Sequence, residues 1–158
     1  MTKKFLIVAN TKMNLNNSEM SVLIHRLDQK VTQHKNLEIV LAPSFQHLSF
    51  VHSQLNHRKF KLAAQDGYYV DQGAFTGEVS FAQLSGLVSY AIIGHSERRR
   101  YFHDDLPIVA KKVEAAVRNK IKVVLAVGET SQEKHQQETK QVLHDQITSA
   151  LMHLTPQR

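Results

Sequence analysis

Tyr90-Ala-Ile-Ile-Gly-His-Ser-Glu-Arg-Arg99 joins a short apolar run to a polar run through one glycine. Such an apolar run closed by glycine is typical of a buried parallel strand. Because α/β folds place their chemistry at the carboxyl ends of these strands, we expect His95 to emerge there. Ser96 and Glu97 then open a helix, whose positive amino-terminal partial charge favours the neutral His95 ring. A neutral imidazole in this place can polarise a carbonyl group.

Four further segments repeat the pattern of an apolar strand followed by apolar residues at helical spacing. The five expected strands are Phe5–Ala9, Glu38–Ala42, Phe60–Gln65, Ser89–Gly94 and Ile121–Val127. With five helices between and after them, they recur at roughly 30 residues per unit, the rhythm of parallel βαβ architecture. We therefore predict a single α/β domain over residues 1–158.

The helices are expected to begin at recognisable caps, which lie at Asn17 and Ser18, at Pro43 and Ser44, at Asp105 before Pro107, and at Thr130 with Glu133. The last helix is expected to run unbroken from the Thr130 capping box to Thr155-Pro156. The connection over residues 66–80 is long for a βα loop, and long loops of this kind are usually functional.

Composition limits the classes of function. The 158 residues include no cysteine, which excludes disulfides and thiolate chemistry and suits a cytoplasmic protein. No apolar run approaches the roughly 18 residues of a membrane span, so we expect a soluble protein. The net charge of +6 permits binding of anionic metabolites or nucleic acid, but no block of like charges appears. A solvated basic surface is the favoured interpretation, and a nucleic-acid binder a distant one.

Asn10 and Lys12 follow the first strand directly, so a barrel-like arrangement brings them to the same rim as His95. A lysine in this place can hold a phosphate or stabilise a developing oxyanion. A lysine standing alone would more simply be a solvated loop residue. The presence of Asn10 and His95 at the same rim favours the functional interpretation.

Five ordered strings of the sequence resemble the triosephosphate isomerase family, and together they cover nearly the whole chain. They are Ala9-Asn-Thr-Lys-Met-Asn14, Ala63-Ala-Gln-Asp66, Gly73-Ala-Phe-Thr-Gly-Glu-Val-Ser80, Ile92-Ile-Gly-His-Ser-Glu-Arg-Arg99 and Val127-Gly-Glu129. The resemblance implies a TIM (β/α) barrel of which this chain carries about five of eight units. It also implies interconversion of dihydroxyacetone phosphate and D-glyceraldehyde 3-phosphate, a step of glycolysis and gluconeogenesis, with no cofactor or metal.

The same resemblance assigns roles to individual residues. Asn10 and Lys12 bind the substrate, with Lys12 countering its negative charge, while His95 is the electrophile that shuttles protons between the two substrate oxygens. Glu97 is either the partner of Lys12 or merely a first-turn carboxylate favoured by the helix dipole. Ser96 is expected to support the site as a cap rather than as a catalyst, and Arg98 and Arg99 are expected to form ion pairs on the rim.

The glycine-bracketed tip at Phe75 and Thr76 exposes an apolar side chain, which a monomer has little reason to do. The resemblance implies that this tip inserts into a second subunit of a homodimer, near the residues of the first and fourth strands. The alternative is a tip that folds back on its own surface.

The chain stops at Arg158, where the family's sixth strand is about to begin. The resemblance places the catalytic glutamate after strand six and the lid and phosphate loops beyond it, so we expect an incomplete barrel that is inactive alone. Its edge strands should expose an apolar face and favour self-association. A complementing carboxyl-terminal fragment is one partner that would complete it. The rival hypothesis is a non-catalytic half-barrel, either a relic or an anion-binding and interaction module.

Overall fold

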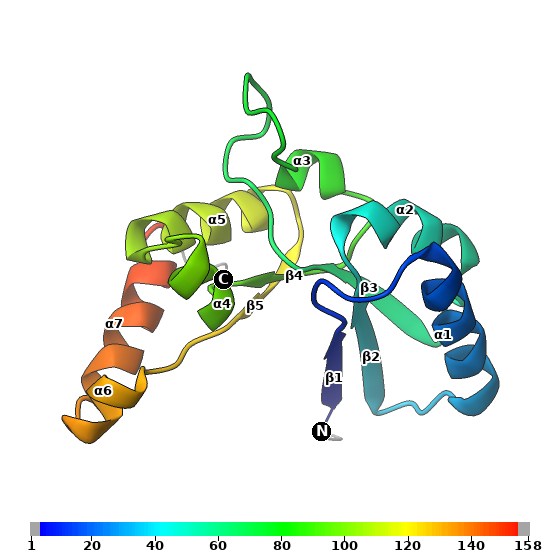
Figure 1. Cartoon of the computed structure of the whole chain (residues 1–158), viewed down its shortest axis with the longest axis horizontal. Helices are drawn as coiled ribbons and strands as arrows, with labels where there is room; N and C mark the ends of the chain where they lie inside the picture. Colours follow the sequence, from blue (N-terminus) through cyan, green and yellow to red (C-terminus); the bar gives the residue numbers. More distant parts are fainter. Residues whose placement is uncertain (1–3, 155–158) are drawn as a thin grey trace.

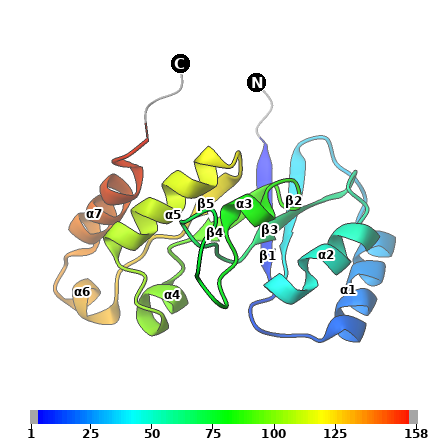
Figure 2. The same ribbon diagram turned by 90° about the horizontal axis from the view of Figure 1, so that it is seen from above.

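A computed structural model of the chain describes residues 4–154. Its framework is one parallel sheet in the order β1-β2-β3-β4-β5, and each strand pairs with the next one in sequence. The strands are β1 (Phe5–Asn10), β2 (Leu37–Ala42), β3 (Phe60–Ala64), β4 (Tyr90–Ile93) and β5 (Lys122–Leu125). The sheet curls so that the helices lie along its outer side (Figures 1 and 2). The predicted α/β fold, an incomplete TIM barrel of five βα units, is confirmed.

The helices follow the strands in alternation, with extra short helices after β4 and β5. They are α1 (Asn17–Lys30), α2 (Phe45–Gln54), α3 (Phe81–Leu84), α4 (Ser96–Tyr101), α5 (Leu106–Arg118), α6 (Ser131–His135) and α7 (Thr139–Leu151). No helix in the described part of the chain is both long and apolar enough to span a membrane.

Helix caps fall close to the predicted residues. Asp105 caps α5 by accepting a hydrogen bond from the Ile108 backbone, and Thr130 forms a capping box with Glu133. The first cap was misplaced by one residue, because Asn16 rather than Asn17 or Ser18 forms the capping box of α1.

The predicted unbroken last helix is wrong. The chain instead forms α6 and α7, separated by a turn in which Gln137 adopts a left-handed conformation with φ 61°. The segment 131–141 carries no apolar residue, so no buried face holds a continuous helix there. The stop predicted at Thr155-Pro156 lies outside the described residues.

Two apolar clusters lie on the two faces of the sheet. The larger cluster packs the sheet against the helices and includes Phe60, Phe81 and Val113, all at most 1% exposed. The smaller cluster contains strand residues alone, among them Val40 and Ile92, and so lies on the concave face that no described helix covers. Val8 of β1 packs against it, and alternation along the strand then directs Asn10 to the same face.

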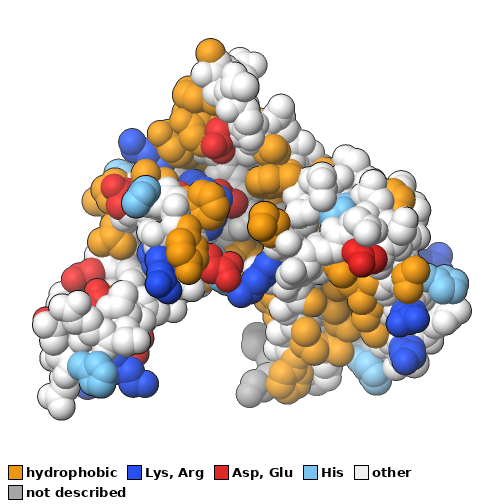
Figure 3. Space-filling view, in the orientation of Figure 1, with side chains coloured by type: hydrophobic (Ala, Val, Ile, Leu, Met, Phe, Trp, Pro, Cys, Tyr) orange, Lys and Arg blue, Asp and Glu red, His pale blue; other side chains and the backbone are white. Residues whose placement is uncertain are grey.

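Strand β1 departs from the prediction of a buried strand. Phe5, Leu6 and Ile7 are 55%, 47% and 51% exposed, although β1 pairs with β2 along its whole length. Within residues 4–154, β1 and β5 each pair on one side only, so both are sheet edges. Figure 3 shows the resulting arch, which is hollowed between β1 and α6. The exposure therefore follows from the open arrangement, because a parallel strand is buried on both faces only when other elements pack on both of its sides.

Candidate active site

A cleft of about 250 Å³ lies at the carboxyl ends of β1 to β4. Most of the polar residues singled out in the sequence line it. The lining residues are Asn10, Lys12, Met13, Ser44, Phe45, Gln65, Asp66, His95, Glu97, Arg98 and Phe102. The structure thus brings together Asn10, Lys12, His95 and Glu97, as the parallel topology predicts. Ser96 is exposed and does not line the cleft.

His95 is placed by the turn that connects β4 to α4. Gly94 makes this turn with φ 76°, and a Cβ atom there would lie 3.0 Å from the Ala126 carbonyl oxygen. His95 itself is the amino-terminal cap of α4, in place of the expected Ser96, because its Nδ1 accepts a hydrogen bond from the Glu97 backbone N–H at 3.3 Å.

The same hydrogen bond fixes the tautomer of the His95 ring. Nδ1 also lies 3.4 Å from a carboxylate oxygen of Glu97, a contact that would require a proton on Nδ1. We assign the acceptor role to Nδ1, because the backbone N–H is a fixed donor at a helix terminus. The ring is then neutral and carries its proton on Nε2, where it can be donated to a carbonyl oxygen.

Lys12 occupies a left-handed backbone conformation with φ 55°, which is unfavourable for a residue with a Cβ atom. Its N–H donates to the side-chain oxygen of Asn10 at 2.9 Å. Asn10 is thereby bound to the Lys12 peptide, and Lys12 is directed across the cleft towards α4.

Lys12 and Glu97 meet although they follow β1 and β4, two strands that are not adjacent in the sheet. The Lys12 ammonium donates to Glu97 at 2.6 Å, and the two side chains are 51% and 43% exposed. The hydrogen bond from Lys12 is the main cause that lowers the pKa of Glu97 below its ordinary value of 4.5. Of the two alternatives for Glu97, the structure shows the contact with Lys12. What either residue does to a substrate stays a prediction.

Gln65 has a place in the site that the sequence alone did not indicate. Its side-chain amide donates to the Ala42 carbonyl at 2.8 Å and to the Lys12 carbonyl at 3.0 Å. The Lys12 peptide is therefore held on both sides, by Asn10 at its N–H and by Gln65 at its C=O. The left-handed conformation, worth roughly 1–3 kcal/mol of strain, is sustained by these contacts.

A buried ion cluster beneath the cleft was also missed. Lys112 of α5 is 3% exposed and contacts Asp66 at 2.9 Å and Asp104 at 2.6 Å. Arg98 of α4 contacts the same two carboxylates at 2.8 and 2.9 Å. No sequence pattern indicated that Asp66 and Lys112 meet, because the two residues are 46 positions apart.

Burial and charge act in opposite directions on the two carboxylates of the cluster. Burial raises the pKa of Asp66, and it outweighs the contacts with Lys112 and Arg98. Burial also acts to raise the pKa of Asp104, but there the hydrogen bonds from Arg98 and Lys112 prevail and lower it. Both carboxylates contact both cations, but Lys112 lies closer to Asp104 than to Asp66. Asp104 is therefore the carboxylate that stays ionised more readily.

The two rim arginines differ in what they contact. Arg98 forms ion pairs as predicted. Arg99 forms none within residues 4–154 and instead donates to the backbone carbonyls of Gly94, Ala126 and Gly128. It thereby joins the end of β4 to the segment that follows β5.

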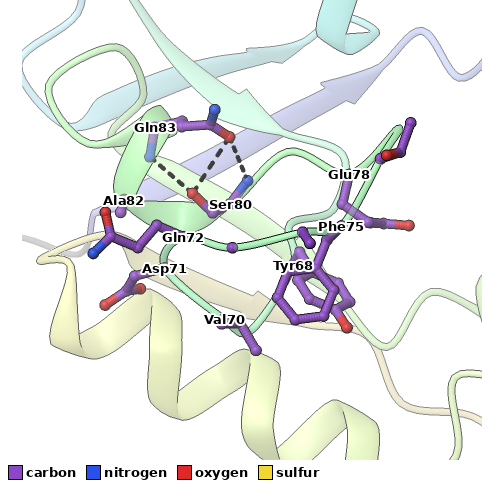
Figure 4. Close-up of a pocket in the computed structure, with 12 residues that line it drawn as sticks. Tyr68, Val70, Asp71, Gln72, Phe75, Glu78, Ser80, Ala82 and Gln83 are labelled. Carbon is purple, nitrogen blue, oxygen red and sulfur yellow. Dashed lines mark hydrogen bonds between the residues drawn. The ribbon is translucent and has the colours of Figure 1, made fainter.

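The loop over residues 66–80 rises from the body of the molecule (Figure 1). At its tip the ring of Phe75 packs against the ring of Tyr68, with the two centroids 4.8 Å apart (Figure 4). Phe75 nevertheless remains 41% exposed. The loop encloses a separate hollow of about 680 Å³ that shares no lining residue with the cleft. Phe75 therefore folds back in part, and Thr76 beside it is exposed. Insertion of the tip into a second subunit stays a prediction.

Across residues 4–154, no three side chains of His, Cys, Asp or Glu are grouped as a metal site would require. The cleft offers the ammonium of Lys12 and the imidazole of His95. It also offers the amides, carboxylates and guanidinium of Asn10, Gln65, Glu97, Asp66 and Arg98.

Comparison with known proteins gives one consistent match. The sequence model of the triosephosphate isomerase family matches residues 5–158. Triosephosphate isomerase of Thermodesulfovibrio yellowstonii is 39% identical over 98% of this chain and 63% of its own length. The enzyme of Alkaliphilus metalliredigens is 40% identical over 98% of this chain and 62% of its own length. That of Dictyostelium discoideum is 35% identical over 92% of this chain and 57% of its own length. The chain spans about three fifths of the length of these relatives.

Proposed function

Because the chain belongs to the triosephosphate isomerase family, we propose that it provides the half of an isomerase site that binds the substrate and polarises its carbonyl group. The relatives are named as isomerases of a triose phosphate, and the reaction proposed from the family resemblance is the interconversion of dihydroxyacetone phosphate and D-glyceraldehyde 3-phosphate. The single observation that carries the proposal is the convergence of Lys12 and His95 on one cleft, with Nδ1 of His95 accepting from the Glu97 N–H.

In the proposed reaction a base removes a proton from the carbon next to the carbonyl, and the electron pair of that C–H bond moves towards the carbonyl oxygen. The Nε2 proton of His95 is donated to this oxygen as the enediolate forms. Nε2 then takes the proton of the neighbouring hydroxyl, the new C=O bond forms at that carbon, and the base returns its proton to the former carbonyl carbon. His95 thus starts and ends the cycle as a neutral ring.

Lys12 opposes the negative charge of the phosphate and of the developing enediolate. Its ammonium is already directed across the cleft by Glu97, so little side-chain entropy remains to be lost when substrate binds. Asn10 lines the same cleft, and its side-chain nitrogen remains to contact the substrate while its oxygen holds the Lys12 peptide.

We place the carbon base outside these 158 residues. The family resemblance assigns it to a glutamate after a sixth strand, and the sheet of residues 4–154 has five strands. A positioned acid or base contributes about 10²–10⁴-fold, and the lid and phosphate loops add orientation and exclusion of water. These 158 residues alone are therefore not expected to isomerise triose phosphates at a useful rate.

The assembly and cellular setting belong to the same proposal. We propose a cytoplasmic enzyme of glycolysis and gluconeogenesis that works as a homodimer. The dimer is supported by exposed apolar side chains on the rim of the cleft, where Met13 is 95% and Phe102 60% exposed. The Phe75 tip of a second copy is the complementary apolar surface.

The experiment measures triose-phosphate isomerisation by these 158 residues alone and by a mixture with a fragment that carries strands six to eight of a relative. We expect turnover in the mixture and none with the 158 residues by themselves. His95→Gln and Lys12→Met should each lower the turnover of the mixture by at least about 10²-fold. Exposed His144→Gln is the matched control and should leave it unchanged. Turnover by the 158 residues alone that depends on His95 would show that the base lies among them. Turnover in the mixture that survives His95→Gln would refute the role of His95.

A further inference from the structure

We propose that Asp66 and Lys112 are positioning residues of the candidate active site. The ion cluster that they complete with Arg98 and Asp104 holds α4, and with it Glu97 and His95, in place at the rim of the cleft. The inference rests on the proposed function only in taking Lys12, His95 and Glu97 as the site.

Helix α4 needs an anchor because apolar packing does not supply one. It is six residues long and buries none of them, although the structure describes it in full. Tyr101 at its end and Phe102 beyond it are both 60% exposed. Isolated helices of this length are unstable in water, so contacts outside the helix must hold it.

Two arginines of α4 reach partners outside the helix: Arg99 donates to backbone carbonyls, among them that of Gly94, and Arg98 reaches buried carboxylates. Its Nε lies 2.8 Å from Asp66 and 2.9 Å from Asp104, and its guanidinium stacks over Phe102 at 4.6 Å. Arg98 follows Glu97 directly and lies within the first turn of the helix that His95 caps. Any movement of Arg98 therefore moves both residues of the cleft.

Lys112 makes this anchor possible by balancing its charge. The groups that face one another in the cluster are the cations Lys112 and Arg98 and the carboxylates Asp66 and Asp104, with Glu78 acting on Arg98 from outside. Asp66, Asp104 and Lys112 are each at most 5% exposed. Buried charges of this kind are tolerated only when paired, and with two cations and two carboxylates each has its partners.

The cluster also joins elements that are distant in sequence. Asp66 follows the end of β3, next to Gln65, which holds the Lys12 peptide. Lys112 lies in the middle of α5, which is firmly packed in the core through Val109 and Val113. The cluster thus ties α4, which buries none of its residues, to the core helix α5 and to the segment that holds the Lys12 peptide.

Removing one charged residue of the cluster should destabilise the protein more than removing one cation and one carboxylate together. Lys112→Met leaves two buried carboxylates for one cation, and Asp66→Asn leaves two cations for one carboxylate. Either change should lower the folding equilibrium constant by on the order of 10²–10³-fold, as for other broken buried pairs. The double variant retains the balanced pair Arg98 and Asp104, and it should recover most of the loss.

The test compares these three variants with the unaltered protein by urea unfolding and by NMR titration of the Glu97 carboxyl carbon. Glu97 has a lowered pKa because Lys12 binds it, so its titration reports whether α4 is still in position. We expect the Glu97 pKa to rise towards 4.5 in both single variants and to return in the double variant. Asp71→Asn, which breaks an exposed pair with Arg118, is the control and should leave Glu97 unchanged.

The outcomes separate positioning from other roles. A loss of stability with an unchanged Glu97 titration in both single variants would show a purely structural cluster and overturn the proposal. Shifts of opposite sign in the two single variants would show a charge effect without movement and would also overturn it. If Lys112→Met does not fold, Asp66→Asn and the double variant carry the comparison. No readout measures isomerisation, so a failure of the proposed function would leave this result intact.

Discussion

Replacing Gln65 by methionine should destabilise the protein by about 1–2 kcal/mol. The variant keeps the length of the side chain but loses the hydrogen bonds to Ala42 at 2.8 Å and to Lys12 at 3.0 Å. Each such bond contributes about 1 kcal/mol net. The sum is an upper value, because the Lys12 carbonyl is accessible to water, which can replace the lost donor.

The assay is urea unfolding followed by circular dichroism. With a slope of about 2 kcal/mol per molar, the midpoint should fall by roughly 0.5–1 M without a change in the slope. Gln54→Met is the matched control, because Gln54 is an exposed glutamine that accepts a hydrogen bond from Ser21 at 3.3 Å. A midpoint for Gln65→Met that falls no further than that of Gln54→Met would refute the account of how Lys12 is held.

Gln65→Glu sharpens the test because it keeps the shape and replaces the donor by an acceptor. Near neutral pH its carboxylate would face the two carbonyl oxygens, so the loss should be at least as large as for methionine. Those carbonyls favour the protonated acid, which raises the folded-state pKa of the new group above its unfolded value. The variant should therefore regain stability as the pH falls through that raised pKa, and a deficit independent of pH would contradict the clamp.

Two further predictions concern Glu97 and the loop tip. The pKa of Glu97 is lowered in the folded state, chiefly by the Lys12 hydrogen bond, so its stabilising contribution is present above the unfolded value of 4.5 and is lost as the pH falls through the lower folded value. Stability measured across that acidic range should fall less steeply in Glu97→Gln, and an identical slope would contradict the contact. Charged substitutions at Phe75 and Thr76 should shift the sedimentation profile of a dimer towards monomer, whereas an unchanged profile would show that the tip only folds back on Tyr68.

The strands and the placement of the site could be predicted because both depend on local sequence. Parallel strands are buried on both faces, so they appear as continuous apolar runs such as Ile92-Ile93. Their carboxyl ends then place Lys12 and His95 at one rim, whatever the details of packing. This placement depends only on the order of the strands along the chain, so it could be predicted without knowing the side-chain packing.

Contacts between distant residues could not be predicted in the same way. Nothing in the string Ala63-Ala-Gln-Asp66 indicates that Gln65 binds a carbonyl of β2, or that Asp66 lies beside Lys112. The cap of α4 was predicted at the wrong residue for a related reason. Both His95 and Ser96 carry a side chain that can accept a hydrogen bond, and the turn at Gly94 decided which one reaches the free N–H.

The polar contacts that shape the cleft arise between β1 and the segment that follows β5. Asn10 and Gln65 hold the Lys12 peptide, and Glu97 receives its ammonium from the far side of the cleft. Arg98 of α4 contacts Asp66 after β3 and Asp104 before α5, and Arg99 contacts the segment after β5. None of these contacts in residues 4–154 uses the edge of β1 that faces away from β2 or the edge of β5 that faces away from β4. A segment that paired with those edges would therefore meet a cleft whose cation and imidazole are already oriented, and it would need to contribute the base and the enclosure rather than the electrophile.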